Sequence, residues 1–132
     1  MLAVAIVIDA LYWTLWFTSR SSVASDTRAA YVEFENAFPL ADAWLGFACL
    51  AAFVALRRRS ATALLWLLAA GGAGLYLFGM DVLYDLEHGI YGKGAGGVIE
   101  AGINVVTLVF SLVVLRWSWT ERDQILASSP SA

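Results

Sequence analysis

The sequence predicts an all-α integral membrane protein, folded as an antiparallel four-helix bundle of transmembrane helices. Of its 132 residues, 61% are hydrophobic and only 14% are charged, whereas soluble domains carry about 25% charged residues. The mean hydropathy of +0.73 agrees with this composition. Four apolar stretches fill most of the chain, each near the roughly 20 residues that a helix needs to cross a bilayer. Short connections between them favour up-down-up-down topology.

The spans follow from the apolar stretches and the residues that interrupt them. Pro39 suits the first turn of the second helix, where its missing N–H costs no hydrogen bond. The triplet Arg57–Arg59 ends that helix sharply. The third span is longer than the hydrocarbon requires, so its last turns should reach the outer interface. We expect the spans at residues 2–18, 37–56, 61–87 and 98–115.

The connections complete a single domain. A polar loop is expected between residues 19 and 36, and a flexible, glycine-rich hairpin connection at Gly89–Gly97. Residues 1–116 form the transmembrane domain, and residues 117–132 form a short cytoplasmic tail that we expect to be partly disordered.

Charge sets the expected orientation. One side carries five basic residues, in the turn Arg57–Arg59 and at Arg116 and Arg122 after the fourth span. The other side carries three, Arg20, Arg28 and Lys93. Cytoplasmic loops carry the excess of Lys and Arg, so both termini are expected in the cytoplasm. The expected partner is the lipid bilayer. Nucleic acid is not expected, because the chain has no face rich in lysine or arginine.

Carboxylates inside the spans are the main functional signal. Asp42, Asp81, Asp85 and Glu100 are expected at similar depth in the outer third of the bundle. A charge at the bilayer centre costs at least about 2.5 kcal/mol, so acids within spans are functional candidates. None of the spans contains a lysine or arginine to offset them. Arg20 and Arg28 in the outer loop could fold over the acids; otherwise the acids must be protonated, share protons or bind a cation.

The fourth span carries the clearest polar stripe. Glu100, Asn104, Thr107 and Ser111 are spaced four, three and four residues apart, which places them on one helix face. Such a stripe must face the bundle interior, a water-filled cavity or another subunit. The alternative role is interhelical hydrogen bonding, worth about 0.6 kcal/mol per contact.

The end of the third span groups three ionisable side chains. Asp81, Asp85 and His88 follow at i, i+4 and i+7, with Tyr84 beside them. Two carboxylates and an imidazole suit a divalent cation, and His88 could instead relay protons near neutral pH. The alternative is a solvated helix end, where acids and histidines need no special explanation.

Two further acids lie in the first and second spans. Asp42 shares a face with Gly46 and Cys49, small residues that indicate close helix contact. Asp9 lies near the middle of the first span, with Tyr12, Trp13 and Trp16 on the same face. These aromatic rings could form a cation-binding wall. They could also be a packing stripe around a protonated Asp9.

Three functions fit these residues. The first is binding of a cation or a proton-coupled ligand, with transport as its extension, which a short chain would achieve as a homo-oligomer. The second is acid–base catalysis, such as isomerisation or cyclisation, on a lipophilic substrate. The third is an accessory subunit of a membrane complex. No cofactor is expected, and neither a metal nor a catalytic residue can be assigned. Transport predicts a path of acids to both sides, whereas catalysis predicts an apolar pocket that opens laterally to lipid.

Overall fold

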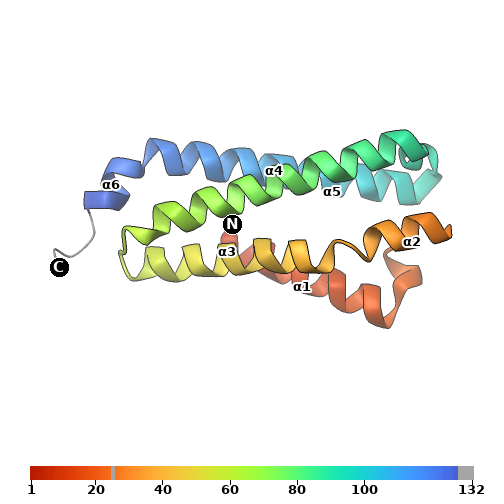
Figure 1. Cartoon of the computed structure of the whole chain (residues 1–132), viewed down its shortest axis with the longest axis horizontal. Coiled ribbons are helices and arrows are strands. Elements are labelled where there is room, and N and C mark those ends of the chain that lie inside the picture. The colour runs from red at the N-terminus through yellow and green to blue at the C-terminus, as the bar shows by residue number, and fades with distance from the viewer. Residues whose placement is uncertain (25, 128–132) are drawn as a thin grey trace.

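A computed structural model describes residues 1–24 and 26–127, and every regular element in these ranges is a helix (Figure 1). The connections contain two short 3₁₀ turns, η1 (Arg20–Ser22) and η2 (Ile90–Gly92). The predicted all-helical class is therefore confirmed. The α-helices are α1 (Leu2–Thr18), α2 (Ala29–Glu35), α3 (Pro39–Arg57), α4 (Thr62–His88), α5 (Gly94–Thr120) and α6 (Arg122–Ala127).

Three helical segments of the described chain are long and apolar enough to cross a bilayer. They are Ala29–Arg57, Thr62–His88 and Gly94–Thr120. The first joins α2 to α3 through a short turn at Asn36–Phe38. At about 1.5 Å per residue, each exceeds the roughly 30 Å of hydrocarbon in a bilayer. These segments suggest a membrane protein. Helix α1 is also apolar, but its 17 residues make it shorter.

The helices pack in chain order. The close contacts join α1 to α3, α3 to α4, and α4 to α5, and each of these pairs of helices runs antiparallel (Figure 1). Helix α1 begins part-way along the bundle and runs toward the end that carries α2 and η2, which we call the α2 end. The opposite end carries the α3–α4 turn and α6, and we call it the α6 end. Helix α1 therefore lines the α2 end.

Small buried residues bring the long helices together. Ala48, Ala52 and Ala70 are completely buried. At Gly74 the missing side chain leaves room for Ser111 of α5, because an alanine Cβ there would overlap the serine hydroxyl. An apolar cluster that includes Leu67 fills the α6 end. The bundle is thus tightly packed between α3, α4 and α5.

Local signals explain where the helices begin and end. Pro39 occupies the first turn of α3, as the sequence predicts. Helix α4 ends at His88, and the following residue, Gly89, adopts a left-handed conformation with φ of 64°. Glycine takes this conformation without the steric cost that a side chain imposes.

The connections differ from the prediction. The expected polar loop at residues 19–36 contains η1 and α2, because Tyr31 and Glu35 bury one face of that segment. The expected glycine-rich linker is shorter, because α5 already begins at Gly94. Helix α5 also continues to Thr120, beyond its expected end. Of the tail expected to be partly disordered, residues 128–132 lie outside the described residues.

Candidate functional site

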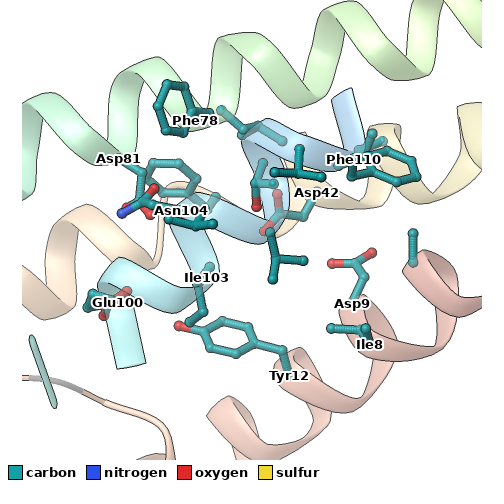
Figure 2. Close-up of a pocket in the computed structure, with 18 of the residues that line it drawn as sticks. Ile8, Asp9, Tyr12, Asp42, Phe78, Asp81, Glu100, Ile103, Asn104 and Phe110 are labelled. Carbon is teal, nitrogen blue, oxygen red and sulfur yellow. The ribbon is translucent and has the colours of Figure 1, made fainter. Parts of the chain in front are cut away.

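A cavity of about 580 Å³ lies between α1, α3, α4 and α5 toward the α2 end (Figure 2). Apolar side chains such as Leu77 and Phe110 form much of its wall. Helices α1 and α5 border it without packing closely on each other. Lining residues on both helices are exposed, including Val4 at 60%, Ile8 at 55% and Val105 at 60%. The cavity therefore opens sideways between α1 and α5.

Five carboxylic acids from five helices line this cavity. Figure 2 shows Glu100, Asp81, Asp42 and Asp9 following one another along it. None of the described lining residues is a lysine, arginine or histidine. The predicted charge imbalance therefore persists in the folded chain. The lining acids are Asp9 of α1, Glu35 of α2, Asp42 of α3, Asp81 of α4 and Glu100 of α5.

Three of the predicted acids converge at the α2 end of the cavity. One carboxylate oxygen from each of Asp81, Asp85 and Glu100 lies within 4.8 Å of the others. Asp85 and Glu100 are only 1% and 3% exposed. Tyr31 Oη donates to Glu100 Oε1 at 2.7 Å, and Asn104 Nδ2 donates to Asp85 Oδ2 at 3.0 Å. Because buried carboxylates must be paired, hydrogen-bonded or neutralised, this cluster can accept a cation or hold a shared proton.

The second acidic region combines Asp9 and Asp42 with aromatic rings. Trp13 Nε1 donates to Asp42 Oδ2 at 2.9 Å. Asp9 lies against α3, where a Cβ at Gly46 would be 3.0 Å from its Oδ2. The rings of Tyr12 and Trp13 meet edge to face, with centroids 5.2 Å apart, and both line the cavity. Aromatic faces beside carboxylates form favourable surroundings for an organic cation.

Some predicted site residues lie outside the cavity lining. Trp16 is buried and donates to Asn36 Oδ1 at 3.1 Å. His88 stacks on Tyr84 with ring centroids 4.0 Å apart, and its Nδ1 lies 2.9 Å from the Tyr84 carbonyl oxygen. The expected grouping of Asp81 and Asp85 with His88 is thus limited to the two acids. Asp85 reaches the acidic cluster but does not line the cavity.

The loop cations do not contact the acids of the cavity. The Arg20 guanidinium lies over the Trp16 ring at 4.8 Å. Arg28 Nε lies 2.5 Å from Asp26 Oδ2, and Lys93 forms an ion pair with the same oxygen. Lys93 and Arg28 hold the pKa of Asp26 well below its usual range. These basic side chains are therefore engaged at the surface of the α2 end.

Three residues of the site were missed by sequence reasoning. Glu35 falls within the expected polar loop, yet it is 6% exposed and accepts a hydrogen bond from Tyr12 Oη at 3.2 Å. Tyr31, four residues before it, points to Glu100. Tyr91 of η2 accepts from Asn104 Nδ2 at 3.0 Å. Burial, with the charge of Asp85, raises the pKa of Tyr91 to about 12. The helical spacing of Tyr31 and Glu35 was the available signal.

No protein-family model, curated protein or solved structure matches this chain. Its function must therefore be inferred from the geometry of the cavity.

Proposed function

We propose that the chain is an integral membrane protein that binds a lipophilic cation in this cavity. All of α1, α3, α4 and α5 would cross the bilayer, with both termini in the cytoplasm and the α2 end outside. The apolar, exposed surfaces of these helices and the distribution of basic residues support this topology. Reporter fusions at the two termini test it: both should report the cytoplasmic side, and opposite sides would contradict it.

One observation carries the proposal of binding. Acids from three long helices, Asp42, Asp81 and Glu100, line one cavity whose remaining wall is mostly apolar. A ligand with a positive head and an apolar body complements both parts. The cavity volume lies within the roughly 300–1,000 Å³ of small-molecule sites. The absence of basic lining residues among those described favours a cationic ligand over an anionic one.

The opening between α1 and α5 supports a ligand that arrives from the bilayer. Its rims carry exposed valine and isoleucine side chains, Val4, Ile8, Val105 and Val109. Such rims suit a molecule that partitions into lipid better than a hydrated ion. The cluster at the α6 end, with Ala55, Leu67 and Val114, is apolar and contains no titratable side chain among the described residues that form it. Binding is therefore better supported than conduction through a single copy.

A second candidate is acid–base catalysis on a lipophilic substrate. It is favoured by the closely spaced oxygens of Asp81, Asp85 and Glu100 beside an apolar pocket. Neighbouring carboxyls can share one proton, and such a pair can give or accept a proton from a bound molecule. Exchange of deuterium from solvent into a bound lipophilic substrate would favour this candidate over simple binding.

Thermal unfolding with two oppositely charged probes tests the binding proposal. The probes are tetraphenylphosphonium and tetraphenylborate, which have nearly the same size and apolar surface. With the protein in nanodiscs, tetraphenylphosphonium should stabilise the fold by about 2.7 kcal/mol at a hundredfold excess over its dissociation constant. Tetraphenylborate should give no comparable shift. Equal shifts would show that the acids do not select charge, and no shift with the cation would contradict the proposal.

Variants connect the effect to the cavity. Asp81→Asn and Glu100→Gln should weaken the response to tetraphenylphosphonium. Asp123→Asn is the matched control, because Asp123 is an exposed acid on α6 with its side chain 81% accessible. A parallel titration with Mn²⁺ distinguishes the small-cation alternative. A Mn²⁺ response that Asp85→Asn removes, without a response to the organic cation, would favour a metal site.

A further inference from the structure

Helix α2 covers the polar end of the cavity. Its residue Tyr31 is completely buried, and the Tyr31 ring packs edge to face on Trp16 with centroids 6.2 Å apart. The Tyr31 hydroxyl reaches Glu100 at the end of the cavity. Phe34 of the same helix stacks on Tyr84 at 3.7 Å between centroids. Helix α2 thus lies between the carboxylates at this end and the surroundings of the protein.

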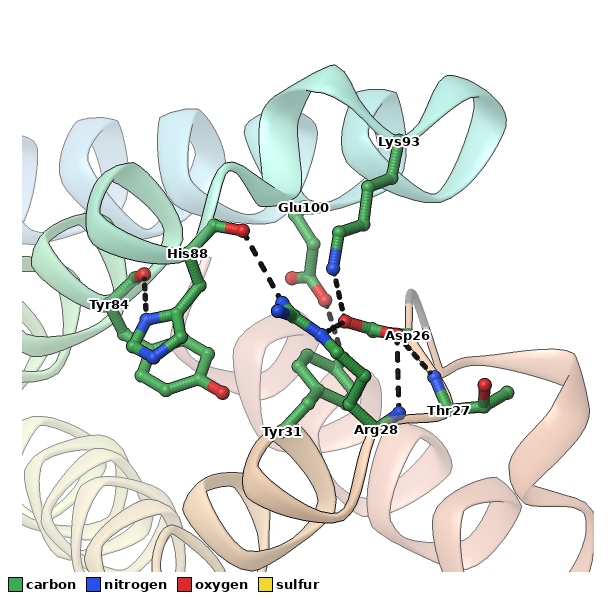
Figure 3. A network of polar contacts seen from close by, with 8 residues as sticks. All are labelled: Asp26, Thr27, Arg28, Tyr31, Tyr84, His88, Lys93 and Glu100. Atoms are coloured by element: carbon green, nitrogen blue, oxygen red, sulfur yellow. Dashed lines mark hydrogen bonds and ion pairs between the residues drawn. The ribbon is translucent and has the colours of Figure 1, made fainter.

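A network of ion pairs fastens the start of this segment (Figure 3). Asp26 accepts from both Arg28 and Lys93, and Arg28 Nη2 donates to the carbonyl oxygen of His88 at 3.3 Å. His88 is the last residue of α4 and Lys93 lies in the α4–α5 connection, whereas Asp26 and Arg28 precede α2. The network therefore ties one connection of the bundle to the other across the α2 end.

We propose that residues 26–35 form a strap over the α2 end, held closed by the ion pair of Asp26 with Lys93 and by the hydrogen bond from Arg28 to the His88 carbonyl oxygen. While it is closed, water-soluble molecules do not reach Glu100, and the cavity is accessible from the bilayer between α1 and α5. This inference rests on the proposed function, because it describes the control of access to that same cavity.

The size of α2 and the exposure of its basic partners explain why the ion pair contributes to closure of the strap. Helix α2 has seven residues, and isolated helices below about 12 residues are marginal in water. Its position therefore depends on contacts with the rest of the protein: Tyr31 and Phe34 pack on neighbouring rings, α3 continues from one end, and the contacts of Asp26 and Arg28 hold the other. The side chains of Arg28 and Lys93 are 50% and 30% exposed, so salt should weaken their pairing with Asp26.

Thiol labelling measures access to the cavity without any ligand. Cys49→Ala removes the native, buried cysteine, and Ile103→Cys places a thiol on the cavity wall near Glu100. Reaction with a charged, membrane-impermeant methanethiosulfonate reports access from water. Reaction with a lipid-soluble maleimide reports access from the bilayer. Both rates are measured in nanodiscs.

Opening of the strap should affect one reagent only. Lys93→Met or Asp26→Asn should speed the charged reagent by about tenfold, the factor that corresponds to loss of roughly 1.4 kcal/mol of closure. The lipid-soluble reagent should react at the parent rate. Lys93→Arg should stay slow, and Asp123→Asn, which removes an ion pair at the α6 end, should have no effect. A charged-reagent rate unchanged in Lys93→Met and Asp26→Asn would overturn the strap.

A salt series on the parent thiol variant keeps the test independent of folding defects in the variants. The charged reagent should react faster at high ionic strength, and a flat dependence would count against the strap. The outcomes for the strap and for the binding proposal can be distinguished. If the protein showed no preference for tetraphenylphosphonium but the labelling rates changed as expected, only the binding proposal would be contradicted. If the preference were present but the labelling rates did not change, only the strap would be contradicted.

Discussion

Replacement of Gly97 by alanine should disrupt the turn that supports the candidate site. Gly97 lies in the first turns of α5 and is buried. An alanine Cβ there would lie 2.5 Å from the Ile90 carbonyl oxygen and 2.6 Å from that of Tyr91, whereas ordinary contact begins at 3.4 Å. Both obstacles are backbone atoms of η2, so rotation of a side chain cannot relieve the overlap. The α4–α5 turn must move away from α5 instead.

The magnitude follows from two opposing effects. Alanine is favoured over glycine within a helix by about 1 kcal/mol, but overpacking of a buried site costs about 1–3 kcal/mol and occasionally more. Gly102→Ala is the matched control, because it lies on the same helix with nothing within 4 Å of the added Cβ. Gly102→Ala should therefore be neutral or stabilising, and Gly97→Ala destabilising by about 1–3 kcal/mol relative to it.

The assay is unfolding of both variants in the same mild detergent, followed by helical circular dichroism. The turn also carries Tyr91, which bonds to Asn104, and leads directly to Lys93. A shift of η2 should therefore also speed labelling by the charged reagent at position 103. If Gly97→Ala were as stable as Gly102→Ala and labelled at the parent rate, the close packing of η2 on α5 would be refuted.

Three further predictions concern hydrogen bonds and pH at the α2 end. Tyr31→Phe should cost about 1 kcal/mol of unfolding free energy, and a double-mutant cycle with Glu100→Gln should show coupling; additive effects would contradict the contact. Asn104→Leu should cost about 1–3 kcal/mol, because it leaves the buried Asp85 carboxylate without its amide donor; unfolding at the parent midpoint would contradict this. The lowered pKa of Asp26 means that its ion pairs stabilise the fold fully above the unfolded value of about 3.9. This contribution decreases as the pH falls below that value and is lost at the folded pKa, so Asp26→Asn should be less pH-dependent in this range; equal acid dependence would contradict the ion-pair network.

Sequence reasoning was most successful for polar side chains on apolar helices. Their helical spacing defines one face, and the poor solubility of polar groups in lipid directs that face to the interior. The polar stripe of the fourth predicted span, from Glu100 through Asn104 to Ser111, is buried in the bundle. A polar face on an apolar helix has few stable places, so its orientation follows from its spacing. Asp42, for which small residues on the same face indicate close helix contact, and Asp81 both line the cavity.

Sequence reasoning failed at the α2 end, where contacts between distant segments decide the structure. Glu35 and Tyr31 belong to a short polar segment. Its helical periodicity covers too few residues to indicate a helix against a composition typical of a loop. Tyr31 becomes buried because Trp16, Tyr84 and Glu100 surround it. His88 shares the helical spacing of Asp81, but it stacks on Tyr84 away from the acidic cluster.

The amino-acid sequence by itself determines an all-helical chain, long apolar helices and a set of acids without basic partners in the apolar segments. These properties depend on composition and local periodicity, which each segment carries alone. Only the tertiary structure decides that acids from five helices line one cavity and that this cavity opens between α1 and α5. It also decides that Asp26 joins Lys93, a residue far along the chain. Such contacts depend on how the helices pack, and packing is a property of the whole fold.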